Sequence, residues 1–122
     1  MCTSVIVIKI TNVIEKKGVL IIKYLLQVDF PMDVPFGEEM SEAFVDLAKS
    51  INEEPGMIWK IWTENAATKE AGGVYLFETK TDAEKYLTMH SERLASFGIT
   101  DIRVKIFEVN EVLSTINNAP IK

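Results

Sequence analysis

Residues 19–26 constrain the fold most, because this segment of the 122-residue chain is apolar at almost every position. A β-branched, apolar run of this kind is typical of a strand that is buried on both faces of its sheet. Each face of such a sheet needs a covering layer of helices or of another sheet. The chain must therefore cover both faces of the sheet itself, or cover one face and leave the other to a second molecule.

Two helices and further strands follow in a regular order. Helical spacing of apolar residues predicts one helix over residues 38–52 and a second from Thr79 or Thr81 to about Phe97, ended by Gly98. Strands are predicted over three later segments, and a short helical turn near the C-terminus: residues 57–64, 73–79 and 100–109, then 112–120. From residue 19 onward the order is β-α-β-β-α-β. This order predicts a ferredoxin-like α+β fold with a four-stranded antiparallel sheet.

Residues 1–18 are predicted to be an N-terminal extension, and residues 19–122 a single ferredoxin-like domain. Residues 4–14 of the extension are rich in β-branched types. They are expected to add a strand or hairpin, antiparallel to the strand that starts at Val19. No charged region precedes the first apolar run, so a signal peptide is not expected.

Both tryptophans lie in the segment EPGMIWKIWTE, residues 54–64. The Pro-Gly pair ends the preceding helix, and the β-branched and aromatic residues that follow indicate a strand. Because side chains alternate along a strand, Trp59 and Trp62 are expected to point to opposite faces. Lys60 shares its face with Trp62, which makes that face the more polar one. The pattern therefore predicts that Trp59 faces the helices and Trp62 the other side.

Two helices can cover only one face of a four-stranded sheet. The simplest cover for the second face is another copy of the same sheet, which predicts a two-fold homodimer. Tryptophan is a common anchor of such contacts. Trp62 is therefore expected at the dimer interface.

Composition excludes several classes of partner and cofactor. The net charge of −5 argues against nucleic-acid binding, the acidic pI gives no reason for membrane attraction, and no apolar run is long enough to span a bilayer. The single cysteine, Cys2, excludes an internal disulfide and fits a cytoplasmic location. One histidine and one cysteine do not form a zinc pattern, and no GxGxxG motif follows a strand. No metal and no cofactor are therefore predicted.

Five segments carry a family resemblance: FPMDVPFG, SINEEPGMIWKIWTEN, EAGGVYLF, YLTMHSERLASFGI and VKIFEVNEVLSTIN. Together they resemble the YdhR-type monooxygenase family over roughly residues 24–119. The resemblance implies a dimeric α/β barrel related to the antibiotic-biosynthesis monooxygenases, which oxidise polycyclic aromatic substrates with O2. It also implies a small aromatic ligand in an apolar pocket. Residues 1–18 lie outside the family pattern.

The candidate site residues are expected on faces that turn inward. His90, the only histidine, lies on the apolar stripe of its helix and is either a core histidine or a general base or proton relay. Trp59 either packs in the core or forms a flat wall for an aromatic ring. Tyr75, Phe77 and Tyr86 are expected to line the same pocket. Each buried phenol needs a partner, which is either a substrate carbonyl or a backbone carbonyl.

Three functions are compatible with these features. The first is a cofactor-independent monooxygenase, in which a base converts the substrate into an electron-rich anion that reacts with O2. The second is a dimer that binds a small molecule without turning it over. The third is a haem-degrading oxygenase of the same fold, in which His90 would be the iron ligand. A haem titration separates the third from the others, and oxygen consumption separates the first from the second.

Overall fold

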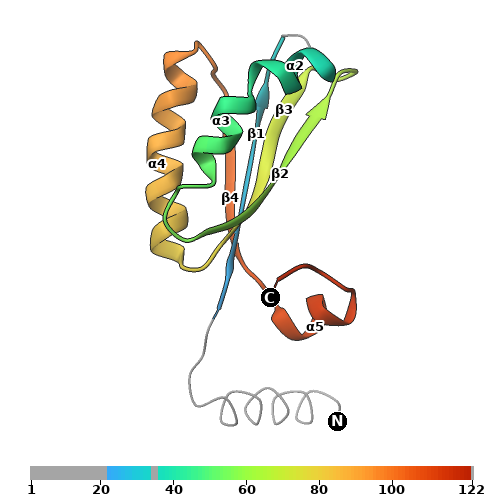
Figure 1. Ribbon diagram of the computed structural model, residues 1–122, viewed down its shortest axis with the longest axis vertical. Helices are drawn as coiled ribbons and strands as arrows, with labels where there is room; N and C mark the ends of the chain where they lie inside the picture. Colours follow the sequence, from blue (N-terminus) through green and yellow to red (C-terminus); the bar gives the residue numbers. More distant parts are fainter. Residues whose placement is uncertain (1–21, 34–35, 122) are drawn as a thin grey trace.

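The computed structural model describes residues 22–33 and 36–121, which contain a four-stranded sheet and its covering helices (Figure 1). The strands are β1 (Tyr24–Pro31), β2 (Met57–Asn65), β3 (Glu70–Phe77) and β4 (Arg103–Glu108). They lie in the order β2-β3-β1-β4, and every neighbouring pair is antiparallel. With helices between β1 and β2 and between β3 and β4, this topology confirms the ferredoxin-like α+β fold.

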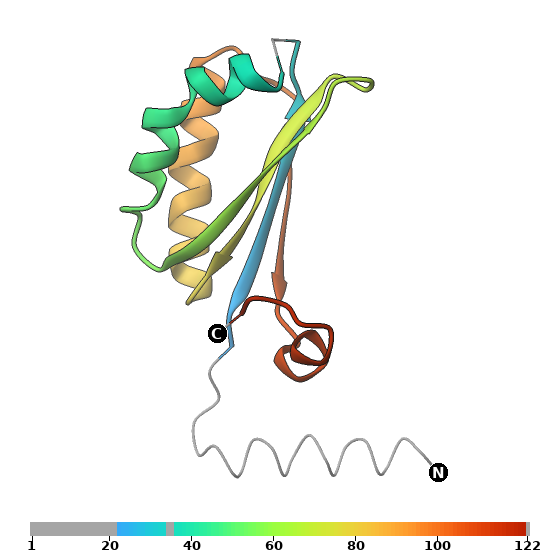
Figure 2. The same cartoon turned by 45° about the vertical axis from the view of Figure 1, so that its right-hand side comes forward.

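The helices α2 (Glu38–Ala43), α3 (Val45–Ile51) and α4 (Lys80–Ser96) cover one face of the sheet (Figure 1). Phe44 interrupts the single first helix that the apolar stripe predicts, with φ −108° and ψ 14°. The α4 helix begins as predicted, because the Thr79 side chain accepts a hydrogen bond from the backbone N–H of Asp82. The predicted C-terminal turn is α5 (Glu111–Ile116), which lies on the other side of the sheet (Figure 2).

The core lies between this helical layer and the sheet. Alternate residues of β1 and β3 supply most of it, as the two-residue period of a strand requires. The largest fully buried side chains on this side are Leu26, Val28, Tyr75, Phe77 and Ile51. Burying each large side chain contributes on the order of 1.5–3 kcal/mol, so this layer holds the helices to the sheet.

The second face of the sheet is only partly covered. At one end, the Trp59 indole N–H donates to the carbonyl oxygen of Pro120 at 2.6 Å, and Ile121 is buried. The C-terminal segment after α5 therefore covers this end (Figure 2). Farther along, Ile61 and Phe107 keep 54% and 44% of their surface exposed. The predicted extension, residues 1–18, with its added strand, lies outside the described residues.

The orientation predicted for the two tryptophans is wrong. Met57 is opposite Phe77 and packs on the helix side, but the register shifts before Trp59, which is opposite Leu76. This bulge adds one residue to β2, and a slip of one residue moves every later side chain to the other face. Trp62 consequently faces the helices, where it stacks on Phe44 with ring centroids 5.9 Å apart.

Candidate functional site

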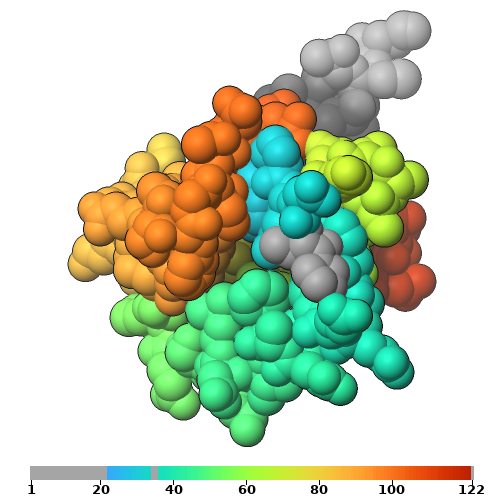
Figure 3. Space-filling view, turned by 90° about the horizontal axis from the view of Figure 1, so that it is seen from above, coloured from blue at the N-terminus to red at the C-terminus, as the bar shows by residue number. Residues whose placement is uncertain are grey.

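A cavity of about 450 Å³ lies between the helices and the sheet. Seen from above, the molecule is hollowed between α4 and the α2–α3 pair (Figure 3). Much of the wall is aromatic, and the basic side chains that line it come from β2 and α4. The aromatic residues are Phe30, Phe44, Trp62, Tyr75 and Phe97, and the basic ones Lys60, His90 and Arg93. An apolar cavity with a few convergent polar groups is typical of a small-molecule site.

Lys60 extends from β2 across the floor of this cavity. Its Nζ lies 3.4 Å from the centroid of the Trp62 ring and 4.7 Å from that of Tyr75. Gly73 on the neighbouring strand makes room for the side chain, because a Cβ at Gly73 would lie only 2.6 Å from the Lys60 Cε. The strand pairing and the missing side chain of Gly73 therefore fix the position of the amine.

The amine of Lys60 is held in surroundings that disfavour its charge. Burial, and then the positive charge of Arg93, lower the pKa of Lys60 from 10.5 to about 7. Within the described part of the chain, no carboxylate oxygen lies within 4.0 Å of either cation. Lys60 thus divides between ammonium and free amine near neutral pH, and only the free amine is a base.

Four side chains behind Lys60 form a closed circuit of polar contacts. The Arg93 Nη2 donates to His90 Nδ1 at 3.0 Å and to the Tyr86 hydroxyl at 3.3 Å. The Tyr86 hydroxyl donates to that of Tyr75 at 3.3 Å, and the Tyr75 hydroxyl lies 3.4 Å from His90 Nε2. Arg93 reaches His90 because three residues make about one turn of α4.

Arg93 fixes where the protons of this circuit lie. A guanidinium has no acceptor, so His90 Nδ1 must accept and the neutral imidazole carries its proton on Nε2. His90 Nε2 and Tyr86 then both donate to the Tyr75 oxygen. The hydroxyl proton of Tyr75 is left without an acceptor inside the circuit. Because Tyr75 lines the cavity, this proton is available to a ligand.

The histidine and the two tyrosines of the circuit are kept uncharged. His90 has only 4% of its surface exposed, and burial, then Arg93 and Lys60, lower the pKa of His90 to about 3. Burial also raises the pKa of the Tyr75 and Tyr86 hydroxyls. A neutral histidine whose only lone pair faces a guanidinium is poorly suited to accept a substrate proton. In the proton-acceptor role expected of His90, the geometry favours Lys60.

The structure brings some of the expected residues together and separates others. His90 and Tyr75 line the cavity, and Tyr86 lies behind them within the circuit. Phe77 contacts Tyr75 and Tyr86 with ring centroids 6.2 and 5.6 Å apart and is a core residue beside the site. Trp59 faces away, so Trp62 takes the position of the aromatic wall.

The sequence reasoning missed Lys60 and Arg93. Lys60 lies between two tryptophans in a strand, and Arg93 lies three residues after the only histidine. Both spacings were visible, but lysine and arginine are usually solvated, and neither spacing alone shows burial. The bulge in β2 was the missing information for Lys60.

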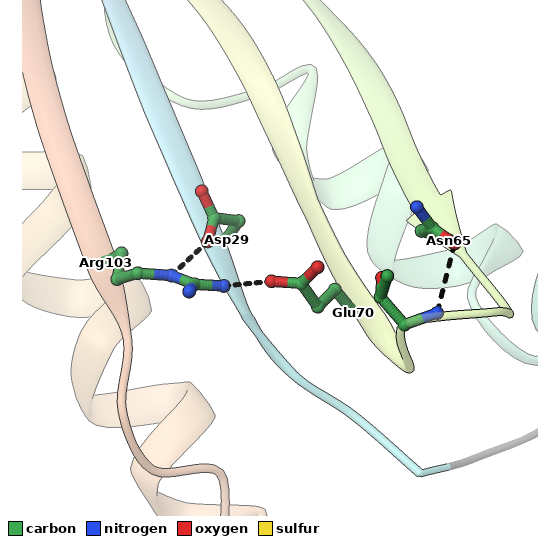
Figure 4. Close-up of polar contacts among 5 residues, drawn as sticks. Asp29, Asn65, Glu70 and Arg103 are labelled. Atoms are coloured by element: carbon green, nitrogen blue, oxygen red, sulfur yellow. Dashed lines mark hydrogen bonds and ion pairs between the residues drawn. The ribbon is translucent and has the colours of Figure 1, made fainter.

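A second polar cluster lies on the open face of the sheet (Figure 4). Arg103 Nε donates to Asp29 Oδ1 at 2.5 Å, and Arg103 Nη2 contacts Glu70. Asp29 and Arg103 are direct neighbours across β1 and β4. Hydrogen bonds with Glu70 and Asp29 raise the pKa of Arg103, so this cation is fully paired.

The described residues, 22–33 and 36–121, show neither a membrane-spanning helix nor a cluster of metal-binding side chains. None of their helices has the length and apolar character that a membrane crossing requires. In the same part of the chain, no three histidine, cysteine, aspartate or glutamate side chains are grouped so that they could hold a metal ion.

Solved structures with a similar fold include three from bacteria. A "putative antibiotic biosynthesis monooxygenase" from Deinococcus radiodurans is 12% identical, with a TM-score of 0.54 over 71% of this chain and 92% of that chain. A protein of unknown function from Nitrosomonas europaea is 14% identical, with a TM-score of 0.54 over 74% and 91%. A monooxygenase from the gene ActVA-Orf6 of Streptomyces coelicolor, in complex with nanaomycin D, is 17% identical, with a TM-score of 0.50 over 73% and 88%.

The family is identified from the sequence. Comparison with curated proteins gives no match. Residues 25–120 match the family described as "Putative mono-oxygenase ydhR". This range includes all the described helices and strands except Tyr24, the first residue of β1. The structural neighbours at this identity support the fold alone, and two of the three are monooxygenases by name. The chain therefore belongs to the ydhR monooxygenase family.

Proposed function

We propose that this protein is a cofactor-independent monooxygenase, which uses O2 to oxidise a small aromatic or polycyclic substrate bound between helices and sheet. The observation that carries the proposal is Lys60, an amine with a pKa of about 7 inside a largely aromatic cavity. Membership of the ydhR family supports the reaction class. The cavity, about 450 Å³, falls in the range of small-molecule sites.

Lys60 acts as the general base in this proposal. Its free amine removes an acidic proton from the substrate, which leaves an electron-rich aromatic anion. The ammonium formed is then next to that anion and to Arg93, so the new negative charge offsets the repulsion between two cations. A base is most effective when its pKa lies near the working pH, as that of Lys60 does.

The oxidation needs no external reductant if the reacting carbon is a methylene flanked by aromatic rings. The carbanion gives electrons to O2, and a carbon–oxygen bond forms. The carbon loses both C–H bonds, which supply four electrons, and becomes a carbonyl. One oxygen atom enters that carbonyl and the other leaves as water, so atoms and electrons balance.

The remaining residues of the site position the substrate and exclude water. The stacked pair Phe44 and Trp62 presents a flat wall along which a planar ring can lie. The circuit of Arg93, His90 and the two tyrosines holds Tyr75 in one orientation. His90 is a positioning residue in this scheme. Both its ring nitrogens are engaged, which gives no support to a role as haem ligand.

Oxygen consumption with hydroxylated anthrone-like or naphthol-like compounds tests the proposal. Wild-type protein is expected to consume O2 and yield a quinone, whereas Lys60→Met should lose about 10²–10⁴-fold in rate, the usual value of general-base assistance. Lys85→Met, which removes the same charge from an exposed position of α4, is the matched control. Activity that survives in Lys60→Met contradicts the role of the base. A ligand that binds but is never oxidised identifies a non-catalytic binding protein.

We also propose that the protein works as a homodimer joined through the open sheet face. Ile61 and Phe107 leave apolar surface exposed there, as do Val112, Leu113 and Ile116 on α5. A second copy is a self-complementary cover for such a face. Light scattering at micromolar concentration is expected to give twice the chain mass, and a monomer would contradict this assembly.

A further inference from the structure

We infer that the cavity binds its aromatic ligand through an ionised oxygen, held by Lys60, Arg93 and the Tyr75 hydroxyl. This inference rests on the proposed function, because it names the chemical form in which the substrate of that site binds. It concerns binding and not turnover. Three observations carry it: the balance of charge around the cavity, the polar hydrogens left without acceptors, and the aromatic wall beside them.

The charges that line the cavity are mostly positive, although the chain has a net charge of −5. Lys60 and Arg93 contribute two cations. Asp33 is the one acidic residue among the lining residues of the described chain, but its side chain is 85% exposed and lies 3.6 Å from Lys69. Among the described residues, Lys60 and Arg93 therefore have no carboxylate within 4.0 Å. Buried charges in proteins are normally paired, so a ligand anion is the missing partner.

Two polar hydrogens at this wall lack acceptors among the described residues. The buried Arg93 Nε has no hydrogen-bond partner. The Tyr75 hydroxyl proton is also free, because its oxygen accepts from both His90 and Tyr86. Leaving a buried donor unsatisfied is costly, and most such groups in folded proteins find a partner. An oxyanion, which only accepts hydrogen bonds, matches both donors and the Lys60 ammonium.

The ring of the ligand has its own place. Trp62 and Phe44 stack beside Lys60, and both residues line the same cavity. A planar aromatic body along this wall would carry its ionised oxygen toward Lys60. Phenolates, enolates and aromatic carboxylates share this combination of a flat ring with an acidic oxygen. A neutral hydrocarbon would leave the cations and the free donors unsatisfied.

Binding of an anion should also change the protonation of Lys60. Without ligand, burial and Arg93 favour the free amine. An oxyanion beside the amine favours the ammonium. A substrate that arrives with its acidic proton gives that proton to Lys60, as in the proposed base step. A ligand that is already ionised leaves the amine to take a proton from solvent, so its binding takes up protons above neutral pH. By thermodynamic linkage, affinity for a fixed anion must then fall as the pH rises.

Isothermal titration calorimetry with matched probes tests the inference. 2-Naphthoate is ionised at neutral pH, and naphthalene-2-carboxamide is its neutral analogue of similar shape. The wild-type protein is expected to bind the naphthoate about 10- to 100-fold more tightly, the ratio expected for hydrogen bonds to a charged group. Titration in two buffers of different ionisation enthalpy should show proton uptake with the naphthoate and none with the carboxamide.

Variants locate the site. Lys60→Met should reduce the preference for the anion to nearly equal binding, and Tyr75→Phe should weaken naphthoate binding by about 10-fold through loss of one donor. Lys85→Met should keep the full preference. Equal affinity of the two probes for the wild type, a preference that survives Lys60→Met, or no binding of 2-naphthoate up to millimolar concentration would overturn the inference. Preferential binding without any O2 consumption would leave the inference standing and refute the oxygenase instead.

Discussion

The two faces of the sheet hold their cations in opposite ways. On the open face, Arg103 contacts two carboxylates, Asp29 and Glu70, and all three are accessible to water. On the helix-covered face, Lys60 and Arg93 lie beside aromatic rings, with no carboxylate within 4.0 Å among the described residues. The open-face cluster is complete in itself, whereas the cations of the cavity have no carboxylate partner among the described residues.

This difference separates structural from functional charge. A paired surface cation contributes little to stability, because water already solvates it well. An unpaired cation inside a cavity opposes folding, and such positions are typical of functional sites, where charge is kept for a ligand. The lowered pKa of Lys60 has the same cause, because burial disfavours its charged form. Substitutions on the two faces should therefore have opposite signatures in stability and in activity.

The largest expected change in stability follows from Lys60→Met. Between pH 7 and 10.5 the unfolded chain binds a proton at this position that the folded chain does not, so the free energy of unfolding rises with pH in this window. Below pH 7, both the folded and the unfolded chain carry the proton, so the folded chain bears the full cost of burying the Lys60 ammonium. At pH 6 the variant should therefore be more stable than the wild type by about 1–4 kcal/mol. Urea unfolding at several pH values measures this, and a less stable variant would show that Lys60 is structural.

His90→Ala should act on stability in the opposite direction. The substitution removes one of the two hydrogen-bond partners of Arg93 Nη2 and of the Tyr75 hydroxyl, and both keep Tyr86. This loss costs about 1–3 kcal/mol. It should slow turnover about 10-fold by loosening Tyr75, while the apparent pKa of the pH–rate profile stays near 7, as expected if Lys60 and not His90 is the base. Loss of that pKa in His90→Ala would assign the base to the histidine.

The wild-type protein should also lose stability in acid through His90. Its pKa is lowered from 6.5 to about 3, so the unfolded chain takes up a proton in this range before the folded chain does. The free energy of unfolding should fall from pH 6.5 toward pH 3. In His90→Ala this part of the acid dependence should be weaker, which urea unfolding over the same range can measure.

Gly73→Ala tests how the sheet positions the amine. The added Cβ would lie 2.6 Å from the Lys60 Cε, which belongs to a flexible side chain that can move away. We expect a stability change within about 1 kcal/mol but a shift of Lys60 from its place over Trp62. Turnover should fall while the far-ultraviolet circular dichroism spectrum stays that of the wild type. Unchanged turnover would show that the position of the amine is not critical.

Arg103→Met on the open face should have the smallest effect on the folded chain and its chemistry. The ion pairs it removes are accessible to water, so thermal unfolding of the isolated chain should change little. Turnover per chain should stay at the wild-type value. If the dimer forms through this face, light scattering should show weaker self-association, because two carboxylates lose their partner. A strong loss of turnover would contradict the division of roles between the two faces.

Much of the fold could be predicted from the sequence because its elements obey local rules. The Pro-Gly break, the Thr79 cap and the apolar run of β3 each act over a few residues, and each is present in the structure. The order of elements then leaves few topologies. The split of the first helix at Phe44 was not predictable in this way, because Phe44 packs on Trp62 from a distant part of the chain.

The site was harder to predict because it depends on register between strands. A bulge before Trp59 reverses the faces of β2, and nothing in the alternation of MIWKIWTE marks it. The polar appearance of the Lys60 face suggested the side away from the helices, with Trp62 at a dimer interface, although that face lines the cavity. His90, Tyr75 and Tyr86 could be predicted because they lie on apolar faces. Their burial follows from those faces and does not depend on the register between strands.

The most direct test of this account is a nuclear magnetic resonance titration of the lysine side chains in isotope-labelled protein without ligand, with Lys60→Met used to assign the signal. The account predicts that Lys60 titrates with a pKa of about 7. The signal of Lys85, which is exposed on α4, is followed in the same sample. Titration of Lys60 near the ordinary lysine value of 10.5 would contradict the account, because the cavity would then hold no base at neutral pH.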